Sequence, residues 1–287
     1  MLLPPTPHRQ HAVDAVLSFL EDNNQATAAA ARNFVARVLE LAIHDISLDS
    51  NAELSQEQID KLLPLLQRLQ TGEPLAYVEG SVGFYKHDFV IDPRALIPRA
   101  DSEVVVELCL ENLNSNSHLR LLDVGAGSGC LIISLLSELP HAEGVAIDIE
   151  GEALELAALN AKTIGVDQRL QLLNSDCLVE LDPSDMFDLI VSNPPYITHG
   201  EELGPSVAEY EPHSALFVTD GDAMQFYRRI MIEAKAHLLP KAVLVFEIGA
   251  NRQDDLALAA GECGYQVLEQ REDMCSVVRA ISLQLIA

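Results

Sequence analysis

The stretch LLDVGAGSGC, residues 121–130, joins a short apolar segment to three glycines that alternate with other residues. LRLLDV (119–124) has the character of a short buried strand, and residues 129–138 have the pattern of a helix. Glycine allows a sharp turn and lets a ligand touch the main chain, and a helix N-terminus offers free N–H groups with partial positive charge. The sequence therefore predicts that the loop Gly125-Ala126-Gly127-Ser128-Gly129 binds a nucleotide or a carboxylate-bearing ligand.

The spacing of these glycines bears on which ligand the loop binds. An ordinary tight turn between a strand and a helix is the simpler interpretation of a single pair of glycines. The dinucleotide fingerprint GxGxxG would need glycine at position 130, where the chain has Cys130. The spacing therefore argues against a nicotinamide-dependent dehydrogenase.

Strand and helix patterns alternate from about residue 100 onward. Strands are predicted at 119–124, 144–148, 170–174, 188–192 and 242–248, with two more β segments within 265–286. Helices are predicted at 129–138, 151–163, 222–239 and 251–263. Such alternation indicates an α/β fold, a doubly wound, mostly parallel seven-stranded sheet with helices on both faces. Ligands of such sheets lie outside the carboxyl ends of the strands.

The N-terminal part of the chain differs from the rest. Apolar residues at three- and four-residue steps predict three or four helices between residues 8 and 70, with Asn24 and Ser55 as helix-start residues. Gly72 and Pro74 end this section, and the β-forming residues of 75–99 suggest a hairpin. The expected organisation is a helical domain for substrate recognition (1–72), a β-hairpin linker (73–99) and a catalytic domain (100–287).

Acidic residues follow two of the predicted strands. Asp148 ends the second strand, 19 residues after Gly129, where a carboxylate can accept hydrogen bonds from ribose hydroxyls. Asp176 and Cys177 follow the third strand, on the side where an adenine would lie. A helix cap or a turn is the simpler role for either aspartate.

The fourth strand ends in Asn193-Pro194-Pro195-Tyr196. A proline-rich turn is the simpler interpretation, but these residues also suit the binding of a planar amide or aromatic amine. The Asn193 side chain and the Pro194 carbonyl can each accept one hydrogen of an NH₂ group, and proline fixes its own backbone while lacking an N–H. Tyr196 can stack on a flat amide or base. The motif therefore predicts a site that orients a planar nitrogen.

Composition argues against several classes of protein. The formal net charge is −26 without a cluster of Lys and Arg, which weighs against a nucleic-acid substrate. Five scattered cysteines and no HxxxH pair among nine histidines favour a reducing compartment such as the cytoplasm and argue against a bound metal. No apolar run reaches the ~20 residues of a membrane span.

Taken together, these segments resemble the HemK-like (PrmC-type) release factor glutamine methyltransferases. The matching segments are GEPLAYVEG (72–80), ALIPRADSE (95–103), LLDVGAGSGC (121–130), SNPPY (192–196), YEPHSAL (210–216) and EIG (247–249). The resemblance implies a Rossmann-like class I methyltransferase fold with S-adenosylmethionine as cofactor. It implies a glutamine side chain in a peptide chain release factor as substrate, with no direct nucleic-acid or membrane binding.

The resemblance also implies roles for individual residues. Gly125 to Gly129 would contact the methionine part of the cofactor, Asp148 its ribose, and Cys177 its adenine side. Asn193 would lie beside the cofactor, and Asn193, Pro194, Pro195 and Tyr196 would grip the glutamine, with Asn193, Pro194 and Tyr196 as the catalytic residues.

Other positions depart from the family pattern or have no assigned role. Ala223 stands where the family usually has glycine, Lys241-Ala242 replaces a glycine-rich turn, and REDMCSVVRA (271–280) lacks the usual Gly-x-Asp-Arg. Arg99 and Glu103 are candidates for an ion pair, although Arg99 could face the substrate instead. His199 is a weak candidate for a proton acceptor.

Five functions remain open at this point. The leading one is methylation of a release factor glutamine, followed by methylation of a ribosomal-protein glutamine or of adenine N6 in nucleic acid. A catalytically silent cofactor-binding module and a dehydrogenase are the other two; the intact Asn193-Pro194 pair opposes the first of these and the glycine spacing the second.

Overall fold

The computed structural model describes residues 2–22, 27–113 and 117–286. Its contacts divide the chain into two compact units. Unit 1 comprises Met1–Gly80 together with Glu202–Tyr210, and unit 2 comprises Ser81–Glu201 together with Glu211–Ala287. Each unit has its own hydrophobic core and is described by itself.

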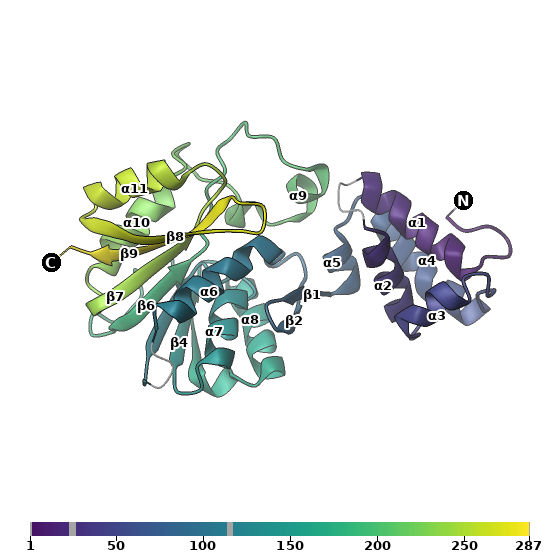
Figure 1. Ribbon diagram of the computed structural model, residues 1–287, viewed down its shortest axis with the longest axis horizontal. Helices are drawn as coiled ribbons and strands as arrows, with labels where there is room; N and C mark the ends of the chain where they lie inside the picture. Colours follow the sequence, from purple (N-terminus) through teal and green to yellow (C-terminus); the bar gives the residue numbers. More distant parts are fainter. Residues whose placement is uncertain (1, 23–26, 114–116, 287) are drawn as a thin grey trace. The chain divides into compact units, whose positions relative to one another are not determined.

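Unit 1 is a helical bundle (Figure 1). Its helices are α1 (Arg9–Asp22), α2 (Ala28–Val38), α3 (Ile43–Leu48), α4 (Gln56–Gln70), α5 (Leu75–Glu79) and α9 (Pro205–Tyr210). Buried residues such as Phe34 of α2 and Leu62 and Leu66 of α4 form its core, as the apolar steps in the sequence predict.

Side-chain caps start two of these helices. Ser55 and Gln58 form a capping box at the start of α4, so the prediction of a helix start at Ser55 is confirmed. The hydroxyl of Thr27 accepts a hydrogen bond from the Ala30 N–H at the start of α2, and Asn24 lies outside the described residues.

The segment before the hairpin is helical, which corrects the β structure expected there. Leu75–Glu79 forms α5, and only β1 (Ser81–Phe84) and β2 (His87–Val90) pair as a hairpin. Pro74 precedes α5, and Gly80 ends it in the left-handed conformation (φ +71°). Proline at the start and glycine at the end of a helix are ordinary boundary residues, and they outweigh the β preference of Tyr77 and Val78.

Unit 2 is built around one sheet of seven strands in the order β5-β4-β3-β6-β7-β9-β8. The strands are β3 (Arg120–Val124), β4 (Glu143–Asp148), β5 (Leu170–Asn174), β6 (Phe187–Ser192), β7 (Leu238–Glu247), β8 (Tyr265–Glu272) and β9 (Val278–Leu285). Strands β5 to β7 in this order pair in parallel, whereas β9 is antiparallel to both its neighbours. The predicted fold class is confirmed.

Helices cover both faces of this sheet (Figure 1). The helices are α6 (Glu103–Glu111), α7 (Cys130–Glu138), α8 (Gly151–Ile164), α10 (Gln225–Ala234) and α11 (Gln253–Glu262). Because side chains alternate along a strand, Leu122 packs with residues of α10 and α11, and the adjacent Leu121 packs with residues of α6 and α7. Both faces of the central strands are therefore buried and apolar.

The strand order changes direction beside β3. The chain runs outward from β3 through β4 to β5 and then returns to the other side of β3 as β6. Such a reversal leaves a crevice at the carboxyl ends of the two central strands. The glycine loop follows β3 and the Asn193 segment follows β6, so both predicted motifs lie at this crevice.

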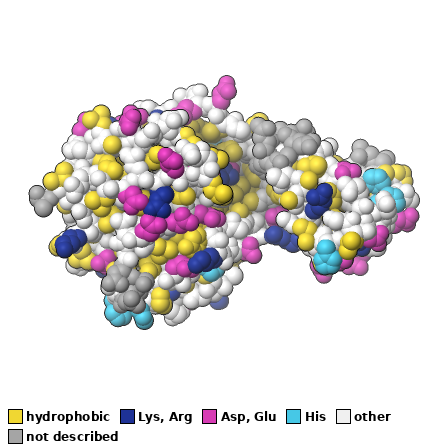
Figure 2. Space-filling model, in the orientation of Figure 1, with side chains coloured by type: hydrophobic (Ala, Val, Ile, Leu, Met, Phe, Trp, Pro, Cys, Tyr) yellow, Lys and Arg dark blue, Asp and Glu magenta, His cyan; other side chains and the backbone are white. Residues whose placement is uncertain are grey.

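Acidic side chains are distributed over the surface of both units. The chain has 44 Asp and Glu residues against 18 Lys and Arg, and on the face drawn in Figure 2 the acidic side chains are scattered among apolar and basic ones. Among the described residues, no helix is long and apolar enough to cross a membrane.

Candidate functional site

The glycine loop turns sharply because three of its residues have a left-handed backbone. Gly125, Gly127 and Gly129 have φ of +74°, +56° and +78°. A Cβ at Gly129 would lie 2.7 Å from Cδ1 of Ile133, one turn further along α7. The N–H groups of Gly125 and Ala126 donate to the Ile147 carbonyl at 2.8 and 2.9 Å, so the loop is fastened to the end of β4.

Asp148 joins the loop to the next strand. Its Oδ2 accepts a hydrogen bond from the Gly127 N–H at 2.8 Å, and its Oδ1 accepts one from the Glu150 N–H at 2.9 Å. Burial raises the pKa of this carboxyl, although both backbone donors lower it. Each carboxylate oxygen can accept a further hydrogen bond, so Asp148 fixes the loop and can still bind hydroxyl groups.

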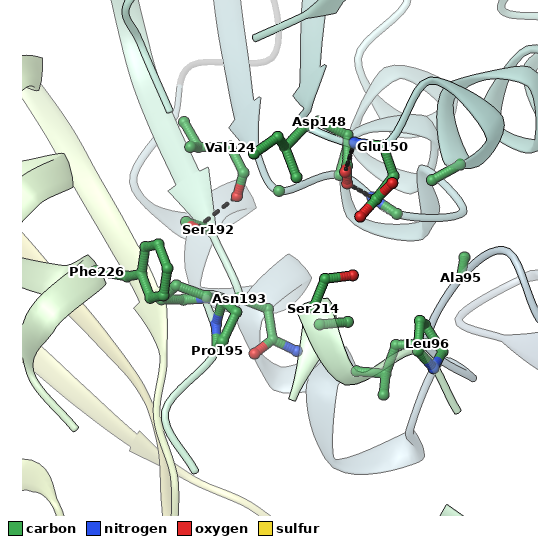
Figure 3. Close-up of a pocket in the computed structure, with 18 of the residues that line it drawn as sticks. Ala95, Leu96, Val124, Asp148, Glu150, Ser192, Asn193, Pro195, Ser214 and Phe226 are labelled. Atoms are coloured by element: carbon green, nitrogen blue, oxygen red, sulfur yellow. Dashed lines mark hydrogen bonds between the residues drawn. The ribbon is translucent and has the colours of Figure 1, made fainter. Parts of the chain in front are cut away.

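A cavity of about 400 Å³ opens at the carboxyl ends of the strands. The predicted residues that line it are Gly125, Ala126, Gly127, Ser128, Asp148, Asp176, Cys177, Asn193, Pro194 and Pro195. Figure 3 shows Asp148 and Glu150 on one side of this space, Asn193, Pro195 and Phe226 on another, and Ala95, Leu96 and Ser214 on a third. Residues far apart in the sequence thus surround one space of the size that small ligands occupy.

The residues after β5 are held in a fixed conformation. Cys177 is buried with a left-handed backbone (φ +53°), and burial raises the pKa of its thiol to about 11. Arg229 of α10 pairs with the Asp176 carboxylate at 2.8 Å. Cys177 is therefore a neutral wall residue, and Asp176 has a structural partner besides any ligand.

The Asn193 segment continues directly from β6. Ser192 donates a hydrogen bond from its hydroxyl to the Val124 carbonyl at 2.6 Å, which ties the end of β6 to the end of β3 (Figure 3). Asn193, Pro194 and Pro195 line the cavity. Two of the predicted catalytic residues thus face the same space as the glycine loop.

Tyr196 lies differently from its neighbours. It is not among the described residues that line the cavity, and its ring packs against the main chain of Gly249. A Cβ at Gly249 would lie 2.8 Å from Cε2 of Tyr196. Burial raises the pKa of the Tyr196 hydroxyl, so this side chain is neutral over the physiological range of pH.

Two roles were left open for Arg99. The predicted ion pair with Glu103 is wrong, and Arg99 lines the cavity. Arg99 pairs with Glu211 at 2.5 Å, and Glu211 also accepts a hydrogen bond from the Ile97 N–H at 3.2 Å. Glu103 accepts a hydrogen bond from the Tyr85 N–H at 2.9 Å. The Glu211 side chain is only 1% exposed, so it joins two segments of the cavity wall, 94–99 and 212–219. Glu211 belongs to the segment YEPHSAL (210–216). The sequence alone does not indicate that it pairs with Arg99.

His199 lies outside the cavity lining among the described residues. It is exposed and stacks on Phe217 with the ring centroids 5.4 Å apart. This contact accounts for its position without a role in proton transfer.

Two buried carboxyl groups beneath the strand ends had no predicted role. Asp123 of β3 accepts a hydrogen bond from the Ile132 N–H at 3.3 Å, and Glu247 ends β7. Burial raises the pKa of each of them to about 7. Among the described residues there is no group of His, Cys, Asp and Glu that could hold a metal ion.

Comparison with solved structures supports the fold. The ribosomal protein L11 methylase of Lactobacillus delbrueckii subsp. bulgaricus matches with a TM-score of 0.53 and 18% identity, over 72% of this chain and 99% of the methylase. A methyltransferase of Pyrococcus furiosus matches with a TM-score of 0.51 and 15% identity, over 78% and 97%. At this level of identity the likeness shows the fold alone.

Family models and curated relatives match at the level of sequence. Residues 101–215 match the model described as methyltransferase small domain, and residues 11–80 match the PrmC N-terminal domain. A bifunctional methyltransferase of Rickettsia typhi is 32% identical over 89% of this chain and 53% of its own length. The chain thus spans about half the length of the Rickettsia relatives.

Two relatives named release factor glutamine methyltransferase are covered more fully. The protein of Nitratidesulfovibrio vulgaris is 34% identical over 89% of this chain and 88% of its own length. The protein of Flavobacterium psychrophilum is 39% identical over 71% and 73%. With matching motifs at one crevice and relatives that align over most of their length, the chain belongs to the HemK/PrmC-type family of release factor glutamine methyltransferases.

Proposed function

We propose that this protein transfers a methyl group from S-adenosylmethionine to the side-chain amide nitrogen of a glutamine in a peptide chain release factor. The observation that carries this proposal is that Asn193 and Pro194 line the same cavity as the glycine loop and Asp148. A donor and a planar acceptor can therefore meet within one enclosed space. The names of the relatives from Nitratidesulfovibrio and Flavobacterium support the choice of substrate.

The residues present fit the proposed cofactor. Gly125, Ala126, Gly127 and Ser128 line the cavity before the start of α7, where a charged amino-acid moiety is stabilised. Gly129 is buried and is not among the described residues that line the cavity. Asp148 retains lone pairs for two ribose hydroxyls, and Cys177 offers a neutral, buried surface beside an adenine. We assign these residues to the methionine, ribose and adenine parts respectively.

The acceptor nitrogen needs careful orientation. S-adenosylmethionine supplies a methyl group that its sulfonium already activates, so positioning is the main task of the protein. The lone pair of an amide nitrogen is delocalised into the carbonyl, and it must point at the methyl carbon. Oδ1 of Asn193 and the carbonyl oxygen of Pro194 can each accept one N–H of the substrate amide, which fixes the nitrogen in place.

Tyr196 is the remaining residue of the motif. Its ring packs against Gly249, and Tyr196 is not among the described residues that line the cavity, so we assign to it the support of the segment that carries Asn193 and Pro194. Rigid placement of these two acceptors reduces the entropy lost when the substrate is oriented.

Unit 1 is the proposed recognition domain. Its matched segment, residues 11–80, corresponds to the PrmC N-terminal domain, and the predicted cofactor residues all belong to unit 2. We assign to unit 1 the contacts with the body of the protein substrate.

Mass spectrometry of candidate substrates tests the proposal directly. The full chain is incubated with a release factor and labelled S-adenosylmethionine, and the peptides are sequenced. The expected product carries one added methyl on a glutamine. Methyl transfer to a ribosomal protein, or to adenine in a nucleic acid, would instead establish one of the two alternatives. The acidic composition of the chain opposes the second of them, a nucleic-acid substrate.

A further inference from the structure

Glu247 lies next to Asn193 but on a different strand. Strands β6 and β7 pair in parallel with Ser192 opposite Phe246, so the following residues, Asn193 and Glu247, come together at the strand ends. Glu247 is only 5% exposed and is not among the described residues that line the cavity. It therefore lies behind Asn193 as seen from the cavity.

The carboxylate of Glu247 is surrounded by fixed groups. The side chains of Ser102 and Asn193 lie close enough to this carboxylate to lower its pKa, while its Oε2 has no hydrogen-bond partner among the described residues. The Tyr227 hydroxyl donates to the Glu247 carbonyl at 3.0 Å and fixes the main chain. A buried carboxylate oxygen without a partner is costly, so the Glu247 carboxylate needs an explanation.

An asparagine amide has nearly the same shape in its two orientations. Only the orientation with Oδ1 toward the cavity lets Asn193 accept an N–H of the substrate. An ionised carboxylate accepts hydrogen bonds and donates none, so a carboxylate behind Asn193 attracts its NH₂ group. The opposite orientation would place two acceptors against each other.

We propose that Glu247 is a positioning residue that turns the NH₂ group of Asn193 away from the cavity and so presents Oδ1 to the acceptor nitrogen. This inference rests on the proposed function for its catalytic consequence, although the orientation itself does not depend on the substrate. Gly249, two residues further along the same strand end, gives room to the Tyr196 ring. The end of β7 thus sets the conformation of both side chains.

The proposal has a consequence for pH dependence. Burial raises the pKa of Glu247 to about 7, and a protonated carboxyl can donate to Asn193 and stabilise the wrong orientation. Other charged or titratable groups also face it. Arg279 of β9 lowers the pKa and Asp101 before α6 raises it, and Cys130, Tyr196 and Tyr227 are also close enough to interact with its charge. The turnover number should therefore fall as pH drops below about 7.

Nuclear magnetic resonance can observe the orientation without any reaction. The full chain, labelled with ¹⁵N-asparagine and bound to S-adenosylhomocysteine, gives side-chain NH₂ signals, and Asn193→Asp identifies the signal of residue 193. This signal should shift with pH with a midpoint near 7, and Glu247→Gln should abolish the shift. If the signal of residue 193 still shifts with pH in Glu247→Gln as it does in the parental protein, Glu247 does not orient Asn193. This conclusion holds whatever the enzyme methylates.

Kinetics then test the catalytic consequence. Glu247→Gln keeps the shape but can both donate and accept, so we expect a kcat lower by about 10-fold to 100-fold with little change in KM. Its profile should be flat from about pH 6 to about pH 8. Asp123→Asn is the matched control, because Asp123 also has a pKa of about 7 but lies at the end of β3; the decline below pH 7 should persist in it.

Three results separate the possible failures. A parental kcat and a retained decline in Glu247→Gln would refute the positioning role. Loss of the decline in Asp123→Asn alone would assign the titration to Asp123 and also refute it. An NH₂ signal that behaves as expected in a protein that methylates no glutamine would leave the role of Glu247 intact and refute the proposed function.

Discussion

At the scale of single residues, Asn193 carries the sharpest test of the proposed chemistry. Asn193→Ala removes one of two acceptors for the substrate NH₂ group and should lower kcat by ~100-fold or more, since a single acceptor leaves the nitrogen free to rotate. Asn193→Asp keeps an acceptor but places a second carboxylate beside Glu247. It should keep its affinity for S-adenosylhomocysteine, measured by calorimetry, and still lose most of the rate. Parental rates in both variants would reduce Asn193 to a turn residue.

Lys241 has a strained backbone conformation. It has a left-handed backbone (φ +71°) within β7, at an irregularity in the pairing with β6. A left-handed residue other than glycine costs about 1–2 kcal/mol, and glycine loses about 0.5–1 kcal/mol through its freedom in the unfolded chain. Lys241→Gly should therefore raise the free energy of unfolding by about 0.5–1 kcal/mol in chemical denaturation. Lys241→Ala removes the same charge but keeps the strain, so an equal gain in that variant would contradict this explanation.

The sequence is informative about some residues and silent about others. The positions of Gly125, Asp148 and Asn193 could be predicted because each follows a strand, and strand ends of a parallel sheet meet at one edge. The partner of Arg99 could not be predicted, because Glu211 is 112 residues away and only the folded chain brings the two together. Tyr196 was expected to face the cavity, but its ring direction depends on the space that Gly249 leaves.

At the scale of elements, the clearest patterns were those of the central strands and their helices. β3 and β6 agree with prediction to within one residue because each is an apolar run that ends at turn residues. α5 was missed although Pro74 and Gly80 mark its ends, since its five residues are too few for a helical period to show. α9 has six residues and likewise gave no periodic signal. Short helices depend on tertiary contacts more than on their own sequence.

Tyr210 tests the contribution of α9 within unit 1. Its hydroxyl donates to the carbonyl or the hydroxyl oxygen of Thr71, at 2.8 and 2.9 Å, at the end of α4. Tyr210→Phe removes this bond and should raise KM for the protein substrate by about 3-fold to 10-fold, which corresponds to a typical net hydrogen bond. Affinity for S-adenosylhomocysteine should not change.

Tyr265→Phe is the control for this experiment. Its hydroxyl donates to the Met231 carbonyl at 2.9 Å within unit 2, so the variant should lose stability and keep the parental KM. If KM rises equally in both variants, general loss of stability explains it and α9 has no special part in recognition.

At the scale of the whole molecule, two buried carboxyl groups should make stability depend on pH. Burial raises the pKa of Asp123 from 3.8 and that of Glu247 from 4.5, in each case to about 7. The folded chain therefore binds these protons more tightly than the unfolded chain, and the free energy of unfolding should fall as pH rises from about 4 through about 7. Between pH 6 and pH 8 the titration of each group should lower the free energy of unfolding by about 1 kcal/mol.

Thermal unfolding at the two pH values measures this effect. Asp123→Asn should reduce the difference in Tm between about pH 6 and about pH 8, because the variant cannot bind the proton. Repulsion among the surface charges changes with pH in the same direction, since the net charge is −26. High salt screens the surface charges but hardly affects buried ones. A difference that vanishes in salt would show that surface repulsion, and not Asp123 or Glu247, causes it.

The division of the chain into units has a consequence for synthesis and for engineering. The chain passes from one unit to the other three times, after Gly80, after Glu201 and after Tyr210. During synthesis, the first 80 residues must wait for α9 until β3, β4, β5 and β6 have already been made. A protease would have to cut at three places to release unit 1 whole. Likewise, a chimera that takes its N-terminal unit from a relative has to take the equivalent of residues 202–210 with it.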